Sequence, residues 1–220
     1  MDAPDTPWPP GWFDPDCRRC PRLAGFLDEV RGIHPTYHAG PVAPFGDPHA
    51  RLLVVGLAPG MHGANATGRP FTGDHAGILL YETLHRYGFG SVPVSRAQGD
   101  GLVLSDCRIT NAVKCLPPQN KPTGGEARQC NAYLRAELAD LGPGSLILAL
   151  GRVAHGAVLM ALDLKTASYP FAHGAGHELP DDRRLLDSYH CSRYNTQTGR
   201  LTTAMFEAVI AQARDWLQAA

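Results

Sequence analysis

Long apolar runs are missing from this 220-residue sequence. No stretch approaches the roughly 20 apolar residues that a membrane-spanning helix needs, so we expect no membrane partner. Residues 1–10 are acidic and rich in proline, and they lack the basic and apolar regions of a secretory signal. These two absences predict a cytoplasmic protein.

A strong net charge is missing as well, because the formal charge at pH 7 is only −1. Residues 51–130 carry eight basic and five acidic side chains, which is a weak indication of a polyanion-facing surface. Internal repeats and low-complexity segments are also missing. With 44% hydrophobic and 19% charged residues, the chain fits a single globular domain over residues 1–220. Within it we interpret residues 1–16 as an irregular leader.

Cysteines are few, but four of the six have a spacing typical of metal ligands. Cys17 and Cys20 form a CxxC pair, and Cys115 and Cys130 offer two more thiols further along the chain. Disulfides are disfavoured in the cytoplasm, so four thiolates indicate zinc or an iron–sulfur cluster. A redox pair and buried apolar thiols are the alternatives, and we interpret Cys107 as core.

Short apolar strands alternate with amphipathic helices along the chain, which favours a parallel sheet covered on both faces. The predicted strands are Leu52–Val55, Arg108–Val113, Leu146–Leu150 and Arg184–Tyr189. The predicted helices are Pro21–Gly32, Ala76–Tyr87, Gly125–Leu141, Val153–Leu162 and Thr202–Gln218. In sheets of this kind, ligands bind in the loops that follow the strands.

The loop after the first strand is rich in glycine, but it matches neither phosphate-binding pattern, G-x-G-x-x-G or G-x-x-x-x-G-K-[ST]. A nucleotide-binding enzyme is therefore a poor interpretation. Arg69, Phe71 and Asp74 offer a cation, a flat ring and a carboxylate, which suit an extruded base and its phosphates. The alternatives are a helix N-cap for Asp74 and a core position for Phe71.

Two polar residues stand out near the ends of other strands. Asn111 lies within the apolar segment 109–113, where its amide needs hydrogen-bond partners from the backbone or from a pyrimidine edge. His190 follows the fourth strand and precedes a polar, basic loop over residues 192–200. Both positions are suited to binding a ligand.

Taken together, these pieces resemble the uracil-DNA glycosylase superfamily, and most closely its family 5, the iron–sulfur type. The resemblance covers roughly residues 15–215. It is carried by Gly56-Leu-Ala-Pro-Gly60, Thr67-Gly-Arg-Pro-Phe-Thr-Gly-Asp74, Ile109-Thr-Asn-Ala-Val-Lys-Cys-Leu-Pro-Pro118, Asn120-Lys-Pro122, His190-x-Ser192 and Thr198-Gly-Arg-Leu-Thr202.

The resemblance implies a three-layer α/β/α sandwich around a four-stranded parallel sheet. It implies removal of uracil, and of other deaminated bases such as hypoxanthine or xanthine, from DNA by an enzyme of base excision repair. It also implies a [4Fe–4S] cluster held by Cys17, Cys20, Cys115 and Cys130. We expect the chain to be a monomer.

The same resemblance assigns roles to individual residues. Phe71 would stack on the extruded base, Asn111 would read its edge, and His190 would donate toward the uracil O2. The base pocket would also include Gly56, Ala58 and Gly60. DNA contacts would come from Arg69, Ser192, Arg193, Asn195 and Arg200.

This chain departs from the family pattern at two positions. Ala58 stands where many relatives outside family 5 have a polar residue that activates water, so the resemblance points to Asp74 for that role. Cys191 stands where proline is usual, and we expect it to leave the backbone before the DNA-probing loop freer. No lysine is clearly placed for a Schiff base, which favours a monofunctional glycosylase. The alternative is a catalytically silent nucleic-acid-binding module that carries a cluster or zinc.

Overall fold

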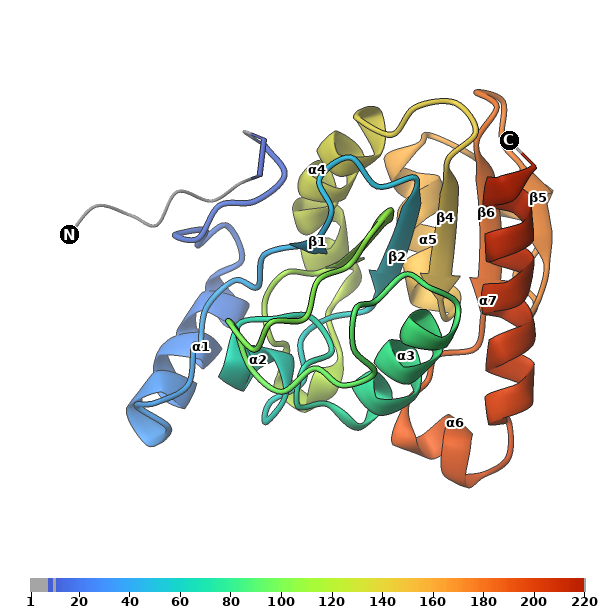
Figure 1. Cartoon of the computed structure of the whole chain (residues 1–220). Helices are drawn as coiled ribbons and strands as arrows, with labels where there is room; N and C mark the ends of the chain where they lie inside the picture. The colour runs from blue at the N-terminus through green and yellow to red at the C-terminus, as the bar shows by residue number, and fades with distance from the viewer. Residues whose placement is uncertain (1–7, 10, 220) are drawn as a thin grey trace.

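The computed structural model describes residues 8, 9 and 11–219 and shows a six-stranded sheet between two layers of helices (Figure 1). The strand order is β1-β3-β2-β4-β6-β5. The four central strands are parallel: β3 (Cys107–Asn111), β2 (Leu52–Gly56), β4 (Leu146–Leu150) and β6 (Arg184–Ser188). The predicted sandwich and its parallel sheet are confirmed. Two short antiparallel edge strands extend the predicted sheet: β1 (Phe45–Gly46) and β5 (Gly176–Glu178).

The central strands are apolar along nearly their whole length because helices cover both faces of the sheet. Successive side chains of a strand point to opposite faces. In β2, Leu52 and Val54 therefore enter one core, and Leu53 and Val55 enter the other.

Two long helices close each core (Figure 1). The first core lies under α3 (His75–Arg86) and α7 (Thr203–Gln218), and the second under α4 (Gly124–Ala139) and α5 (Arg152–Ala161). A third apolar cluster packs under α1 (Pro21–Ile33). The short elements are α2 (Ala64–Thr67), η1 (Pro118–Asn120), η2 (Thr166–Ser168) and α6 (Arg193–Gln197). Among the described helices, none is both long and apolar enough to span a bilayer.

The end of the predicted leader packs against the sheet layers. Residues 1–7 and 10 of that leader lie outside the described part of the chain. The indole of Trp12 is buried, donates from Nε1 to Asp140 Oδ2 at 2.6 Å, and lies 4.0 Å below the Arg108 guanidinium. The described end of the leader is thus attached to the fold at Trp12.

The carboxyl ends of the four parallel strands meet at one edge of the sheet (Figure 1). From β2 the chain first adds β3 on one side, and then crosses over to add β4 and β6 on the other. The direction of winding therefore changes between β2 and β4. Such a switch point opens a crevice for ligands outside the carboxyl ends of the strands.

Candidate active site

A cavity of about 690 Å³ lies at this edge, built from the loops that follow the four parallel strands. Most of the predicted site residues line it. They are Ala58, Gly60, Phe71, Asp74, Asn111, His190, Ser192, Arg193, Asn195 and Arg200. The cavity size is typical of small-ligand sites in proteins.

Asp74 precedes α3, but its carboxylate does not cap that helix. Instead, Oδ2 accepts a hydrogen bond from the backbone N–H of Ala64 at 3.0 Å. Gly60 and Gly63 make room for the carboxylate, because a Cβ at either position would lie 2.1 Å from Asp74 atoms. Burial raises the pKa of Asp74 above its ordinary value, while the amides of Ala64 and Gly60 act in the opposite direction. The glycine-rich loop thus forms a fitted cradle for one carboxylate.

Gly56 brings Phe71 and Asn111 together at the end of β2. A Cβ on Gly56 would lie 2.3 Å from Asn111 Oδ1 and 2.6 Å from Phe71 Cζ. Gly56 does not line the cavity, contrary to the prediction, but Phe71 and Asn111, for which it leaves space, both line it. Asn111 is only 3% exposed, so a group bound in the cavity can satisfy its amide.

The His190 ring stacks on Phe71, with ring centroids 5.9 Å apart and an interplanar angle of 26°. Burial lowers the pKa of His190 to about 4, so the imidazole is neutral at pH 7. Asn195 Nδ2 donates to the His190 carbonyl at 2.8 Å and fixes the backbone there. A neutral imidazole in this place can donate one N–H to a bound group.

Cys191 stands where proline is usual, and the greater freedom expected for this segment stays a prediction. The Cys191 side chain is fully buried in the first core and anchors the segment in place of proline. Ser192 Oγ then caps α6 by accepting from the Asn195 backbone N–H at 3.4 Å. Side-chain burial and capping hold this loop instead of a fixed proline φ.

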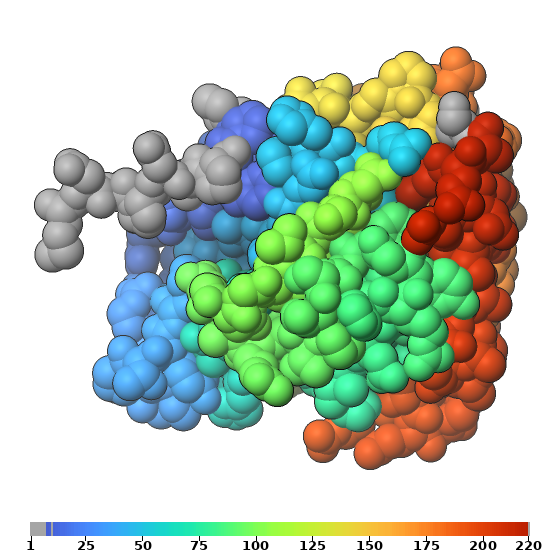
Figure 2. All heavy atoms as spheres, viewed as in Figure 1, coloured from blue at the N-terminus to red at the C-terminus, as the bar shows by residue number. Residues whose placement is uncertain are grey.

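The prediction that Arg69 contacts DNA is wrong, because its side chain is buried within the protein. Its side chain is buried, at 5% exposure, and Nη1 donates to Asp100 Oδ1 at 2.9 Å. Its guanidinium also lies 4.4 Å over the Phe45 ring. Asp100 belongs to the bright green segment that crosses the face shown in Figure 2. Arg69 therefore ties this segment to the fold and does not present its charge to DNA.

Several residues at the cavity were not identified from the sequence. Arg152 and Phe171 line it together with Tyr189. Asn120, from a segment that carries the family resemblance, also lines it. Arg152 could have been found, because it follows the β4 strand end directly, whereas Phe171 lies in a segment without a recognisable pattern. Tyr194 on α6 is 71% exposed, next to the cavity residue Arg193.

The four ligand-spaced cysteines lie around a second, small hollow that shares no lining residue with the first cavity. Cys17 and Cys20 precede α1, Cys115 follows β3, and Cys130 lies on α4. Burial, together with the negative charge that the neighbouring thiols would carry, raises the pKa of Cys115 to about 12. These thiols would become thiolates only beside a strongly cationic group. Cys107 is fully buried in the first core, as predicted.

The sequence is similar to those of known proteins over most of its length. Residues 43–214 match the family model of the uracil DNA glycosylase superfamily. A type-5 uracil-DNA glycosylase of Thermus thermophilus is 49% identical over 203 residues, which cover 90% of this chain and 92% of the relative. A type-5 enzyme of Pyrobaculum aerophilum is 40% identical and covers 97% of both chains. A type-4 enzyme of Thermotoga maritima is 31% identical over 67% of each.

Proposed function

The chain belongs to the uracil-DNA glycosylase superfamily, and from this premise we propose that it hydrolyses the N-glycosidic bond of deoxyuridine in DNA to begin base excision repair. Relatives at 40–49% identity over most of the chain carry this activity in their names. The observation that carries the proposal is the meeting of Asp74, Phe71, Asn111 and His190 on one cavity at the strand ends. Each group has a role in this chemistry.

The reaction requires the base to leave the duplex and enter the cavity, at a cost of a few kcal/mol. The arginines at the rim, Arg193 and Arg200, suit the DNA backbone, and the exposed Tyr194 ring can fill the gap in the base stack. Phe71 then stacks on the base, and the Asn111 amide pairs with its Watson–Crick edge. The amide offers both a donor and an acceptor, as a uracil edge requires.

Bond cleavage places positive charge on the sugar and negative charge on the leaving uracil. His190 donates its N–H to the uracil O2 and stabilises the anion, which later takes up a proton. A neutral donor is suited to this role, because it forms the hydrogen bond without first being charged. One donor aimed at developing negative charge typically changes the rate by about 10²–10³-fold.

Asp74 replaces the polar group that Ala58 does not supply. The ionised carboxylate stabilises the cationic sugar and orients the water whose oxygen bonds to the anomeric carbon. It accepts a proton from that water as the new bond forms. The chain thereby acts as a monofunctional glycosylase, without a lysine intermediate. The cavity of about 690 Å³ has room for a purine, so we extend the proposal to hypoxanthine and xanthine.

For the cysteines, we propose a [4Fe–4S] cluster bound by Cys17, Cys20, Cys115 and Cys130. The four thiols lie around one small hollow, as the ligands of a single bound group would. The Lys114 backbone N–H donates to Cys130 Sγ at 3.3 Å, the kind of bond that supports a bound thiolate. The cluster would tie α1 to α4 and the β3 loop.

All six cysteines are free, which suits a reducing compartment, and we place the enzyme in the cytoplasm as a monomer. The test of the function is release of free uracil from a labelled oligonucleotide, with a matched thymine oligonucleotide as control. We expect release from the first only. Binding to both oligonucleotides without release would instead identify a silent nucleic-acid-binding module.

A further inference from the structure

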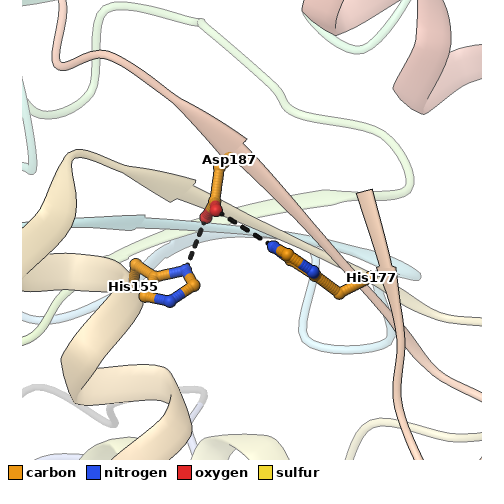
Figure 3. A group of neighbouring side chains, drawn as sticks. All are labelled: His155, His177 and Asp187. Carbon is orange, nitrogen blue, oxygen red and sulfur yellow. Dashed lines mark hydrogen bonds and ion pairs between the residues drawn. The ribbon is translucent and has the colours of Figure 1, made fainter. Parts of the chain in front are cut away.

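Outside the groups used above, His155, His177 and Asp187 form a cluster of two buried side chains and the half-buried His177 (Figure 3). His155 contacts Phe171, which lines the cavity. His155 comes from α5, Asp187 from β6 and His177 from the edge strand β5. The Asp187 carboxylate is fully buried. Its carboxylate ion pairs among the described residues are with these two histidines only.

The hydrogen bonds of His155 determine where its protons lie. Nδ1 is 2.7 Å from Asp187 Oδ1, and Nε2 is 2.9 Å from the Tyr169 carbonyl oxygen. A backbone carbonyl only accepts, so Nε2 carries a proton, and a second proton lies between Nδ1 and the carboxylate. His177 Nε2 lies 3.3 Å from Asp187 Oδ2 on the other side. These hydrogen bonds satisfy both ring nitrogens of His155 and both carboxylate oxygens of Asp187.

His155 also holds the segment 169–175, which forms part of the cavity wall. It donates to the Tyr169 carbonyl where this segment begins, and its ring meets the Phe171 ring edge to face at 5.5 Å. The far end is paired with the Asp187 backbone through Gly174, at 2.8 Å. Phe171 lines the cavity and lies 5.3 Å below the Arg152 guanidinium.

We propose that His155 is a positioning residue that fixes Phe171 as a wall for the bound DNA, with Asp187 orienting the imidazole. The proposal rests on the proposed function, since it concerns how the same cavity binds its substrate. Phe171 lines the cavity but is not among the groups that we place at the reacting bond, so we expect it to contact the nucleic acid equally before and during bond cleavage. Such uniform binding affects KM, whereas kcat stays nearly constant.

Two substitutions of one residue separate positioning from stability. In His155→Gln the amide nitrogen replaces Nε2 and keeps the bond to Tyr169, but Asp187 Oδ1 loses its partner and the carboxylate keeps only His177. In His155→Asn the amide nitrogen replaces Nδ1 and keeps Asp187 paired, but the bond to Tyr169 is lost. A buried carboxylate oxygen without a partner costs more than a carbonyl oxygen without one, so the Gln variant should melt at the lower temperature.

The KM for uracil release should rank the two variants in the opposite order to the melting temperature, with His155→Asn the more impaired. We expect His155→Asn to raise KM for uracil release by about tenfold, as loss of one hydrogen bond would, with kcat changed less than threefold. His155→Gln should stay within about threefold of wild type in both. Affinity for a duplex with uncleavable 2′-fluoro-deoxyuridine should follow KM. If KM followed the melting temperatures instead, His155 would be merely structural.

A double-mutant cycle with Phe171→Ala keeps the proposal testable even if His155→Gln does not fold. Because His155 acts through Phe171, adding His155→Asn to Phe171→Ala should raise KM no further. Additive effects would contradict the proposal, as would stoichiometric zinc that Asp187→Asn removes. A wild-type protein that releases no uracil refutes the proposed function, whereas the affinity ranking on the uncleavable duplex still tests His155.

Discussion

The carboxylate of Asp74 accepts a hydrogen bond from the backbone N–H of Ala64, at 3.0 Å, although Asp74 occupies the N-cap position of α3. The carboxylate therefore turns away from its own helix and toward the loop after β2. Gly60 and Gly63 leave the space that it fills. A side chain placed in this way contributes to the cavity and not to the helix end.

Asp74→Asn should lower the single-turnover rate of uracil release by about 10²-fold or more, because the amide can neither accept a proton nor balance the cationic sugar. Stability should not fall with it. A buried carboxyl with a raised pKa destabilises the fold once it is ionised, so the neutral amide should preserve or raise Tm at pH 7. Melting and single-turnover measurements on one preparation test both. A rate near wild type would remove Asp74 from the chemistry.

Gly60→Ala should reproduce much of that rate defect although the residue at position 74 is still aspartate. The added Cβ would lie 2.1 Å from Asp74 Oδ1, so the carboxylate must move. Gly25→Ala is the matched control, because a Cβ at that helical position meets nothing within 4 Å. We expect the control to keep wild-type turnover and to gain up to about 1 kcal/mol of stability from helix propensity. Equal turnover in both variants would show that the cradle is not needed.

The sequence predicted the parts of the fold that periodicity determines. The strand Leu146–Leu150 has the predicted bounds, because it is a short apolar run that turn residues limit on both sides. The edge strands were not predicted, since Phe45–Gly46 has only two residues and no alternation to detect. Helix α6 has five residues, and its cap at Ser192 is a weak signal without an apolar face.

The site shows the same division between local and distant information. Asp74, Asn111 and His190 were predicted, because each has an unusual type for its place beside a strand end or glycine-rich loop. Arg69 was assigned to DNA because a cation in such a loop suits a phosphate. Its partner Asp100 is 31 residues away, and no local pattern shows that the two will pair and become buried.

Asn111→Asp should change which bases are released rather than the rate on all bases equally. The substitution keeps the shape of the side chain but removes its amide donor, and an extruded uracil needs both a donor and an acceptor at its edge. We expect uracil release to fall by about 10-fold or more relative to cytosine, whose N4 amino group donates where uracil O4 accepts, since one good base contact is worth about 1–3 kcal/mol. Competition between two labelled oligonucleotides measures the ratio, which would stay constant if Asn111 did not read the base.

Cys17→Ser should remove the bound cluster and the fold around α1 while leaving base preference unchanged. The purified wild-type protein should be yellow-brown, with broad absorption near about 400 nm, and the variant should lose that colour and solubility. Cys107→Ser is a matched control, since this thiol lies in the first core, away from the other four. It should keep the colour. A colourless, active wild-type protein with one zinc per chain would contradict the cluster.

His190→Ala should lower the single-turnover rate by about 10²–10³-fold, because the leaving uracil loses a donor to its developing charge. DNA affinity should change much less, since the anion exists only near the transition state. Burial holds the pKa of His190 at about 4, so the imidazole is neutral throughout the range where an ordinary histidine titrates. The pH profiles of wild type and His190→Gln should therefore have the same shape between about pH 5 and pH 8. If the wild-type profile contained a step that the Gln variant lacked, the catalytic form of His190 would be the imidazolium.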